Sequence, residues 1–149
     1  MMFIFGMLLA VSSGTRFAFD RFAWGSAIIL AAVLSVNYGN DCFDIGVDRF
    51  NDSSPISGGS GVMLENPELR GLSKWIAVGL MVFSVILATI FTINYRFPGS
   101  LVAIVIFGNG SIWFYSAPPL RLSYRGLGEI TTMLTAGLIL PWFGYLIML

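Results

Sequence analysis

Residues 74–95 read KWIAVGLMVFSVILATIFTINY, and this stretch decides the fold class. From Trp75 to Tyr95 it carries no charged residue. An α-helix needs about 20 mostly apolar residues to cross the hydrocarbon core of a bilayer. The stretch therefore predicts a membrane-spanning helix.

Four other stretches share this apolar character, and one of them is short. The short one, Met1–Val11, lacks the basic flank and small-residue cleavage site of a signal peptide, so we interpret it as the second half of a spanning helix. A proline suits the first turn of a helix and bends a helix when it lies inside one. The other predicted spans are Phe22 to about Phe43, Pro98–Tyr115 opened by Pro98, and Leu127–Leu149 with a kink at Pro141. The sequence thus predicts an all-α polytopic membrane protein, one domain over residues 1–149, with about five transmembrane helices of which the first is partial.

The composition agrees with a membrane protein and excludes several other classes. Apolar residues make up 56% of the chain and charged residues 11%, whereas a soluble domain carries about 25% charged residues. Basic and acidic residues balance at eight each, so no basic surface suggests nucleic-acid binding. The absence of histidine excludes histidine metal sites and histidine general bases, and the single cysteine, Cys42, excludes an internal disulfide.

Two connecting segments differ from the rest of the chain. Residues 48–73 are long and rich in Gly, Ser, Asn and Pro, and residues 117–126 read APPLRLSYRG. Counting the predicted spans puts both segments on the same side of the membrane. Their side carries five basic residues and the opposite side three, which weakly favours the cytoplasm for both segments. The five are Arg49, Arg70, Lys74, Arg121 and Arg125, against Arg16, Arg21 and Arg96.

The end of the second predicted span is acidic. Asn40, Asp44 and Asp48 recur every four residues, and Asp41 lies three before Asp44, so a helix would place them on one face. Two carboxylates about 6 Å apart repel each other by roughly 3 kcal/mol at an effective dielectric near 20. Magnesium reverses this repulsion, since it prefers one or two carboxylates together with substrate phosphates. The pattern favours a Mg²⁺–diphosphate site; the alternatives are a solvated helix end and a cation pathway in a transporter.

Two motifs give the chain a resemblance to a known family. Asn40–Asp48 resembles NDxxDxxxD, the first aspartate-rich motif of the UbiA superfamily of intramembrane prenyltransferases. Tyr115–Glu129, which reads YSAPPLRLSYRGLGE, resembles the segment between the fourth and fifth helices of that family. Residues 48–62, DRFNDSSPISGGSGV, look most like the 1,4-dihydroxy-2-naphthoate polyprenyltransferases of menaquinone synthesis.

The resemblance implies a fold and a reaction. Family members have nine transmembrane helices around a lipid-open cavity, and this chain resembles the N-terminal half. Magnesium helps the diphosphate leave, and the resulting allylic carbocation alkylates an aromatic ring. The family holds a second magnesium through another acidic motif between its sixth and seventh helices, and the printed sequence ends before that motif. We therefore expect the 149-residue chain to be inactive by itself.

The resemblance also implies site residues. It makes Asn40, Asp41, Asp44 and Asp48 the ligands of Mg²⁺, with Asn40 also contacting substrate and with Asp44 and Asp48 essential for catalysis.

Three further candidates come from the second motif. Tyr115 resembles the family's loop tyrosine and is a candidate catalytic residue. Arg121 and Arg125 are candidates for binding diphosphate oxygens, because a guanidinium can grip phosphate bidentately; the alternative is a basic flank of a cytoplasmic loop. The family often has Tyr-x-x-x-Lys here, whereas this chain has Pro119 in place of the lysine.

The partners implied are a prenyl diphosphate, an aromatic acceptor and membrane lipid, and the location implied is a bacterial or archaeal plasma membrane. Three alternatives remain open. The chain could be a cation transporter or channel fragment, which would show ion flux without prenyl diphosphate. It could belong to another branch of the superfamily, such as the archaeal lipid or 4-hydroxybenzoate prenyltransferases. It could also be a non-catalytic subunit that supplies half a site to a partner.

Overall fold

The computed structural model describes residues 1–44 and 65–149. In these ranges the chain forms helices and short connections, with no β-strand. The main helices are α1 (Met2–Ser12), α2 (Phe19–Phe43), α5 (Arg70–Asn94), α6 (Ser100–Ser116), α7 (Gly128–Leu134) and α8 (Leu140–Met148). Each of the five stretches expected to be helical is helical, and α6 begins two residues after Pro98, which was expected to open it.

Three of these helical stretches are long and apolar enough to cross a membrane. They are Phe19–Phe43, Pro67–Asn94 and Gly128–Met148, where the second includes a short 3₁₀ turn, η1 (Pro67–Leu69). The helices α1 and α6 are apolar but shorter. Length and composition therefore support an all-helical chain of membrane type, and they support three of the five predicted spans.

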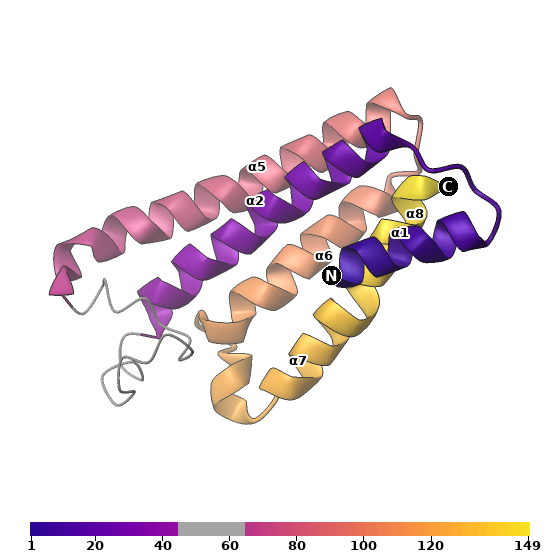
Figure 1. Cartoon of the computed structure of the whole chain (residues 1–149). Helices are drawn as coiled ribbons and strands as arrows, with labels where there is room; N and C mark the ends of the chain where they lie inside the picture. The colour runs from indigo at the N-terminus through magenta and orange to yellow at the C-terminus, as the bar shows by residue number, and fades with distance from the viewer. Residues whose placement is uncertain (45–64) are drawn as a thin grey trace.

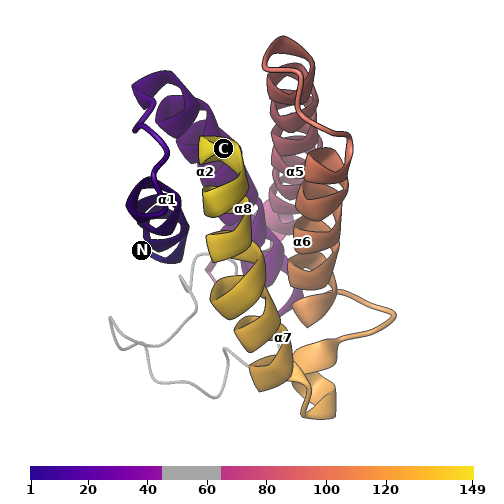
Figure 2. The ribbon, with the colours of Figure 1, turned by 90° about the vertical axis from the view of Figure 1, so that its right-hand side faces the viewer.

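The two longest helices, α2 and α5, lie side by side and run in opposite directions (Figure 1). The helix α6 packs next to α5, and the stretch from α7 to α8 returns along the other side of α6. Viewed from the end in Figure 2, α1 lies against α8, on the opposite side of the molecule from α5. The bundle therefore has one end that gathers the end of α2, the start of α5, the end of α6 and the start of α7.

Small side chains bring α2 and α5 close together. Ser35 Oγ donates to the Ala77 carbonyl at 2.8 Å, and Ser73 Oγ donates to the Tyr38 carbonyl at 2.9 Å. In an apolar medium, small residues and such interhelical hydrogen bonds hold helices together because there is little hydrophobic drive. A third bond, from Arg70 Nε to the Cys42 carbonyl at 3.0 Å, fixes the start of α5 against the end of α2.

Glycines let α1 and α8 touch backbone to backbone. A methyl group added at Gly6 would overlap the carbonyl of Pro141, and one added at Gly144 would overlap the carbonyl of Phe3. Around this contact lies the apolar core, which includes Met7, Ile28, Phe91, Leu101, Phe143 and Ile147. Among the helix contacts at the described glycines, the α1–α8 contact is the one where the two backbones come closest together.

The last long helix changes its winding before Pro141. A π-helical turn, η3 (Thr135–Ile139), separates α7 from α8. Proline has no N–H to donate and clashes with the preceding turn, and a wider turn relieves that clash. The kink expected at Pro141 therefore takes the form of a π-helical turn in the five residues just before α8.

Candidate functional site

The site is built around Asp44, the first residue after α2. Its N–H still bonds to the Asn40 carbonyl at 2.9 Å. Ser116 Oγ donates to Asp44 Oδ2 at 2.6 Å, and Tyr124 Oη donates to Asp44 Oδ1 at 2.8 Å. Each carboxylate oxygen therefore accepts a hydroxyl hydrogen bond from a residue more than seventy positions away in the sequence.

The loop that supplies these hydroxyls folds back onto the end of α6. It contains a 3₁₀ turn, η2 (Leu122–Arg125), flanked by Arg121 and Gly126, both in the left-handed backbone region. Ser123 Oγ donates to the Tyr115 carbonyl at 2.8 Å and ties the turn to the last turn of α6. This fold-back carries the phenol of Tyr124 to the end of α2. The two segments that the sequence analysis singled out therefore meet at one end of the bundle.

The two arginines of this loop have different surroundings. The guanidinium of Arg121 lies over the ring of Tyr124, 5.5 Å from its centroid, in a cation–π contact. The guanidinium of Arg125 donates to the Pro119 carbonyl of its own loop at 3.2 Å. Arg121 is thus the cation that accompanies the Tyr124–Asp44 pair, while Arg125 braces the loop.

Tyr115 lies at the edge of this cluster. Its hydroxyl is next to Gly128, where an added methyl would come within 3.2 Å of the phenol oxygen. The Asp44 carboxylate accepts its two hydroxyl hydrogen bonds from Ser116 and from Tyr124, and not from Tyr115. Neither of these two partners was among the residues chosen from the sequence.

The acidic motif Asn40–Asp48 lies only partly within the described helix α2. The helix α2 ends at Phe43, so Asn40 and Asp41 lie in its last turn and Asp44 follows it. Asp48 lies outside the described residues. Within the ranges that the structure describes, no three acidic, cysteine or histidine side chains gather into a ready metal site. The oxygen donors described here are thus an amide, Asn40, and two carboxylates, Asp41 and Asp44.

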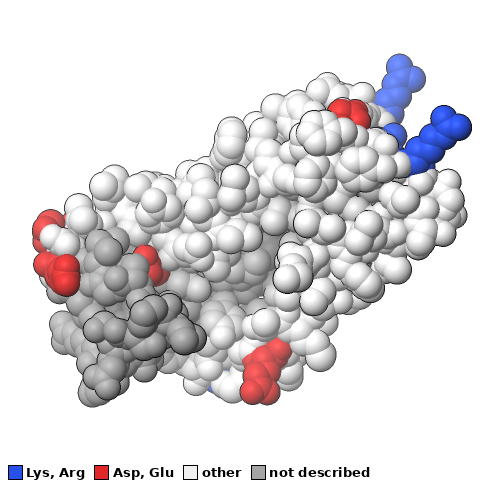
Figure 3. Space-filling model, in the orientation of Figure 1, with Lys and Arg blue, Asp and Glu red and all other residues white. Residues whose placement is uncertain are grey.

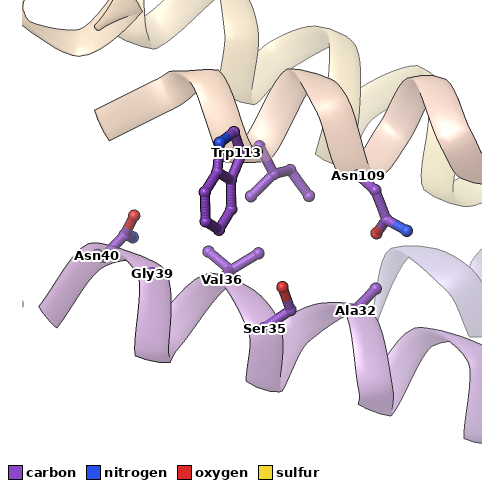
Figure 4. A pocket seen from close by; sticks show the side chains of 8 residues that line it. Ala32, Ser35, Val36, Gly39, Asn40, Asn109 and Trp113 are labelled. Carbon is purple, nitrogen blue, oxygen red and sulfur yellow. The ribbon is translucent and has the colours of Figure 1, made fainter. Parts of the chain in front are cut away.

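A narrow crevice between α2 and α6 opens beside these residues (Figure 4). On the α2 side it is lined mainly by small or polar residues, and on the α6 side by Trp113 and Asn109. We refer to it as the α2–α6 crevice, lined by Ala32, Ser35, Gly39, Asn40, Asn109 and Trp113, with Val36 and Ile112 completing it. It runs from the motif residue Asn40 into the interior of the bundle.

An apolar hollow adjoins the crevice. It is a half-open hollow, whose free space of about 420 Å³ includes space open to the surroundings, and it shares Ala32, Asn109 and Ile112 with the crevice. Its remaining lining comes from α2, α6, η3 and α8 and includes Ile28, Ile139 and Phe143. The π-helical turn contributes Thr135 and Ile139 to this lining. Polar and apolar spaces thus meet at Asn109.

Charged side chains gather at the two ends of the molecule, and the broad surface between them is white on the face shown in Figure 3. At the end away from Asp44, the hydroxyl of Tyr95 donates to Asp20, and the guanidinium of Arg21 lies over the rings of Tyr95 and Phe97. The hydrogen bond to the Asp20 carboxylate raises the pKa of Tyr95 above its usual value of 10.0. This end is tied to α8 by a bond from Arg21 to the Met148 carbonyl at 3.2 Å.

Comparison of the chain with protein-family models, with curated proteins and with solved structures gave no match in any of the three.

Proposed function

We propose that the chain contributes to a UbiA-type prenyltransferase site, in which a prenyl diphosphate is bound through Mg²⁺ and its polyprenyl group passes to an aromatic acceptor. The acceptor that the sequence favours is 1,4-dihydroxy-2-naphthoate, which would place the reaction in menaquinone synthesis. The observation that supports this proposal is the position of Asp44. It belongs to one motif and accepts hydrogen bonds from Ser116 and Tyr124 of the other.

The two hydroxyl donors would orient the Asp44 carboxylate. An unrestrained aspartate rotates freely, whereas one held on both oxygens presents its remaining lone pairs in fixed directions. Ser116 is 1% exposed and Asp44 is half-buried, so water competes less for this bond than for the bond from the exposed Tyr124. This arrangement suits a carboxylate that must bind a cation reproducibly, because catalytic groups depend on supporting residues for their geometry.

The side chains at the end of α2 offer the kind of ligand that magnesium prefers, namely oxygen atoms. Asn40, Asp41 and Asp44 supply oxygen ligands, and magnesium shared with a diphosphate needs only one or two protein carboxylates. When bound, magnesium neutralises charge on the diphosphate and favours its departure. Arg121, which lies over the ring of Tyr124 on the same loop, would be available to bind diphosphate oxygens. Asp48, which belongs to the same motif, is the fourth ligand of the proposal.

The proposal also includes a placement in the membrane. In it, α1 and α6 lie within the bilayer with the three longer helices, which gives five helices in all. The end that carries Asp44 faces the cytoplasm, where a water-soluble diphosphate head group would arrive. The prenyl chain and the acceptor would enter from the lipid.

Binding of radiolabelled farnesyl diphosphate to the chain in lipid nanodiscs tests the proposal. We expect binding that requires Mg²⁺ and that Asp44→Asn weakens at least about tenfold, since a ligand charge at a metal site is lost. Glu68→Gln is the matched control, because it removes an exposed acidic charge in η1, where α5 begins. It should leave the affinity unchanged.

Two results would contradict the proposal. One is farnesyl diphosphate binding that is the same with and without Mg²⁺, and the other is binding that Asp44→Asn does not affect. Cation flux through liposomes in the absence of any prenyl diphosphate would favour the transporter alternative.

A further inference from the structure

The α2–α6 crevice holds a buried amide whose orientation is fixed. Asn109 is 7% exposed, and its Nδ2 donates to Ser84 Oγ on α5 at 2.7 Å. The Ser84 hydroxyl in turn donates to the Met81 carbonyl at 2.8 Å, so its oxygen is left to accept from the amide. This network decides which end of the amide is nitrogen and which is oxygen. The carbonyl oxygen of Asn109 is therefore the end that remains for another partner.

That oxygen has no donor within the described part of the chain. Asn109 lines both the crevice and the apolar hollow, and Figure 4 shows its amide directed from α6 toward α2. Because this oxygen is not sealed off by protein atoms, a ligand in the crevice can donate to it, and a hydrogen bond of this kind contributes about 0.5–1.5 kcal/mol. The Ser35 oxygen on α2 is a second acceptor that lines the crevice. Ser35 donates its hydroxyl proton to the Ala77 carbonyl, so a lone pair on its oxygen remains to accept a hydrogen bond. The crevice thus offers two hydrogen-bond acceptors and, among its lining residues, no charge.

The crevice has room for about one water-sized group, so it suits a single hydroxyl, while the ring that carries this hydroxyl would lie outside it. Small residues on α2, namely Ala32, Ser35 and Gly39, leave room opposite α6. The ring of Trp113 stands between the two helices as one wall (Figure 4) and is held by an edge contact with Phe43. The adjoining hollow is apolar and larger. A planar apolar body in the hollow with one polar edge in the crevice would fill both.

We infer that the α2–α6 crevice binds the hydroxyl edge of an aromatic ligand, with Asn109 Oδ1 accepting the hydrogen bond. Hydroxyl groups match the two acceptors, whereas a carboxylate would be repelled by them, so an aromatic acid such as the proposed acceptor would enter with a hydroxyl and keep its carboxylate outside the crevice. Identification of this ligand as the acceptor of prenyl transfer rests on the proposed function; the binding itself does not. Asn109 is then a specificity residue: it selects a ring that carries a hydroxyl, since a site with a buried acceptor rejects analogues that cannot donate.

A fluorescence titration tests this inference in nanodiscs. Trp113 is made the only tryptophan by replacing Trp24, Trp75 and Trp142 with Phe, so that quenching reports on the crevice. The two probes, kept under argon, are 1,4-dihydroxynaphthalene and 1,4-dimethoxynaphthalene, which differ in their ability to donate. We expect saturable quenching that is at least about tenfold tighter for the dihydroxy compound, in line with the loss of one buried hydrogen bond.

The variant Asn109→Leu should abolish this preference, since it keeps the volume but removes the acceptor. Ser111→Ala is the matched control on α6, because Ser111 bonds only to its own helix at the Phe107 carbonyl. Should Asn109→Leu fail to fold, Ser84→Ala releases the amide, and the preference should fall severalfold. Equal quenching by the two compounds, or a preference that survives Asn109→Leu, would overturn the inference.

The two proposals can fail separately. The titration contains neither Mg²⁺ nor diphosphate, so its outcome does not depend on Asp44. A hydroxyl preference without Mg²⁺-dependent diphosphate binding would uphold the crevice and reject the proposed function. Diphosphate binding without a hydroxyl preference would do the reverse.

Discussion

At the scale of single residues, Asp44 is held by two hydroxyls that differ in exposure. Ser116 is 1% exposed and Tyr124 is 47% exposed. We expect Ser116→Ala to lower the free energy of unfolding by about 1–2 kcal/mol, because it leaves a shielded carboxylate oxygen without its donor. Tyr124→Phe should cost less, below about 1 kcal/mol, since water can replace an exposed phenol. Denaturant unfolding in detergent measures both, and a larger loss for Tyr124→Phe would show that the Tyr124 bond is the shielded one.

A second residue-scale prediction concerns Tyr95. The hydrogen bond to the Asp20 carboxylate raises the pKa of Tyr95 in the folded protein above 10.0. While Asp20 is ionised, the stabilisation from this bond is present up to about pH 10.0 and is lost as the pH rises through the raised pKa of Tyr95. The tyrosinate absorbance that Tyr95→Phe removes should appear at higher pH than that of an unperturbed tyrosine. Asp20→Asn should bring it back to the ordinary range; an unchanged titration would exclude Asp20 as the cause.

The sequence analysis identified Asp44 as a candidate site residue but not its hydrogen-bond partners, Ser116 and Tyr124. Asp44 was predicted from its spacing, because an acidic residue after an apolar span is unusual. Ser116 and Tyr124 were not, since hydroxyl residues are common in loops and carry no spacing of their own. Asn109 had a signal that could have been used, because a side-chain amide within an apolar helix is costly unless it has a partner. Pairing Asn109 with Ser84 still required the arrangement of α5 against α6.

At the scale of helices, the glycine contacts between α1 and α8 give a sharp prediction. Gly6→Ala and Gly144→Ala each put a methyl group onto a backbone carbonyl of the other helix. Overpacking of this kind costs about 1–3 kcal/mol, and we expect each variant to lower the unfolding midpoint in detergent. Gly79→Ala is the control on α5, where nothing lies within 4 Å of the added methyl. A loss for Gly79→Ala equal to that for Gly6→Ala would mean that the close approach is not the cause.

The sequence predicted the helices well because apolar length is a strong local signal. The expected spans Lys74–Tyr95 and Phe22 to about Phe43 correspond to α5 and α2. The form of the bend before Pro141 could not be predicted, since a proline is compatible with a simple kink, a 3₁₀ turn or a π-helical turn. The local sequence contains no information on how α8 packs against α1 and α6, and this packing is part of the setting of the turn.

At the scale of the whole molecule, the bonds of Asp44 make a prediction about topology. They join the end of α2 to the loop after α6, so both must lie on one side of the membrane. Cysteines placed at the exposed positions Glu65 and Arg125 should be labelled from the same face by a membrane-impermeant maleimide. Cysteines at the exposed positions Arg16 and Arg96 should be labelled from the opposite face.

The labelling needs a variant in which Cys42 is replaced, because Cys42 is a free thiol, although a buried one, that could react with the maleimide. The count of basic residues predicts the cytoplasmic face for Glu65 and Arg125. Labelling of these two positions from opposite faces would be incompatible with a shared site. This prediction depends on tertiary contacts that bridge more than seventy residues, whereas the sequence offered only the parity of the spans.

The packing of α1 on α8 has a consequence for how the chain is made. The ribosome makes α1 before α8, its closest backbone partner, and the described helices α2, α5, α6 and α7 are made between the two. During synthesis α1 must wait in the translocon, at the membrane surface or in contact with lipid, with Gly6 and Phe3 uncovered. The packing of α1 is therefore completed only after α8 has been made, and a nascent chain stalled before residue 140 should leave α1 accessible to protease.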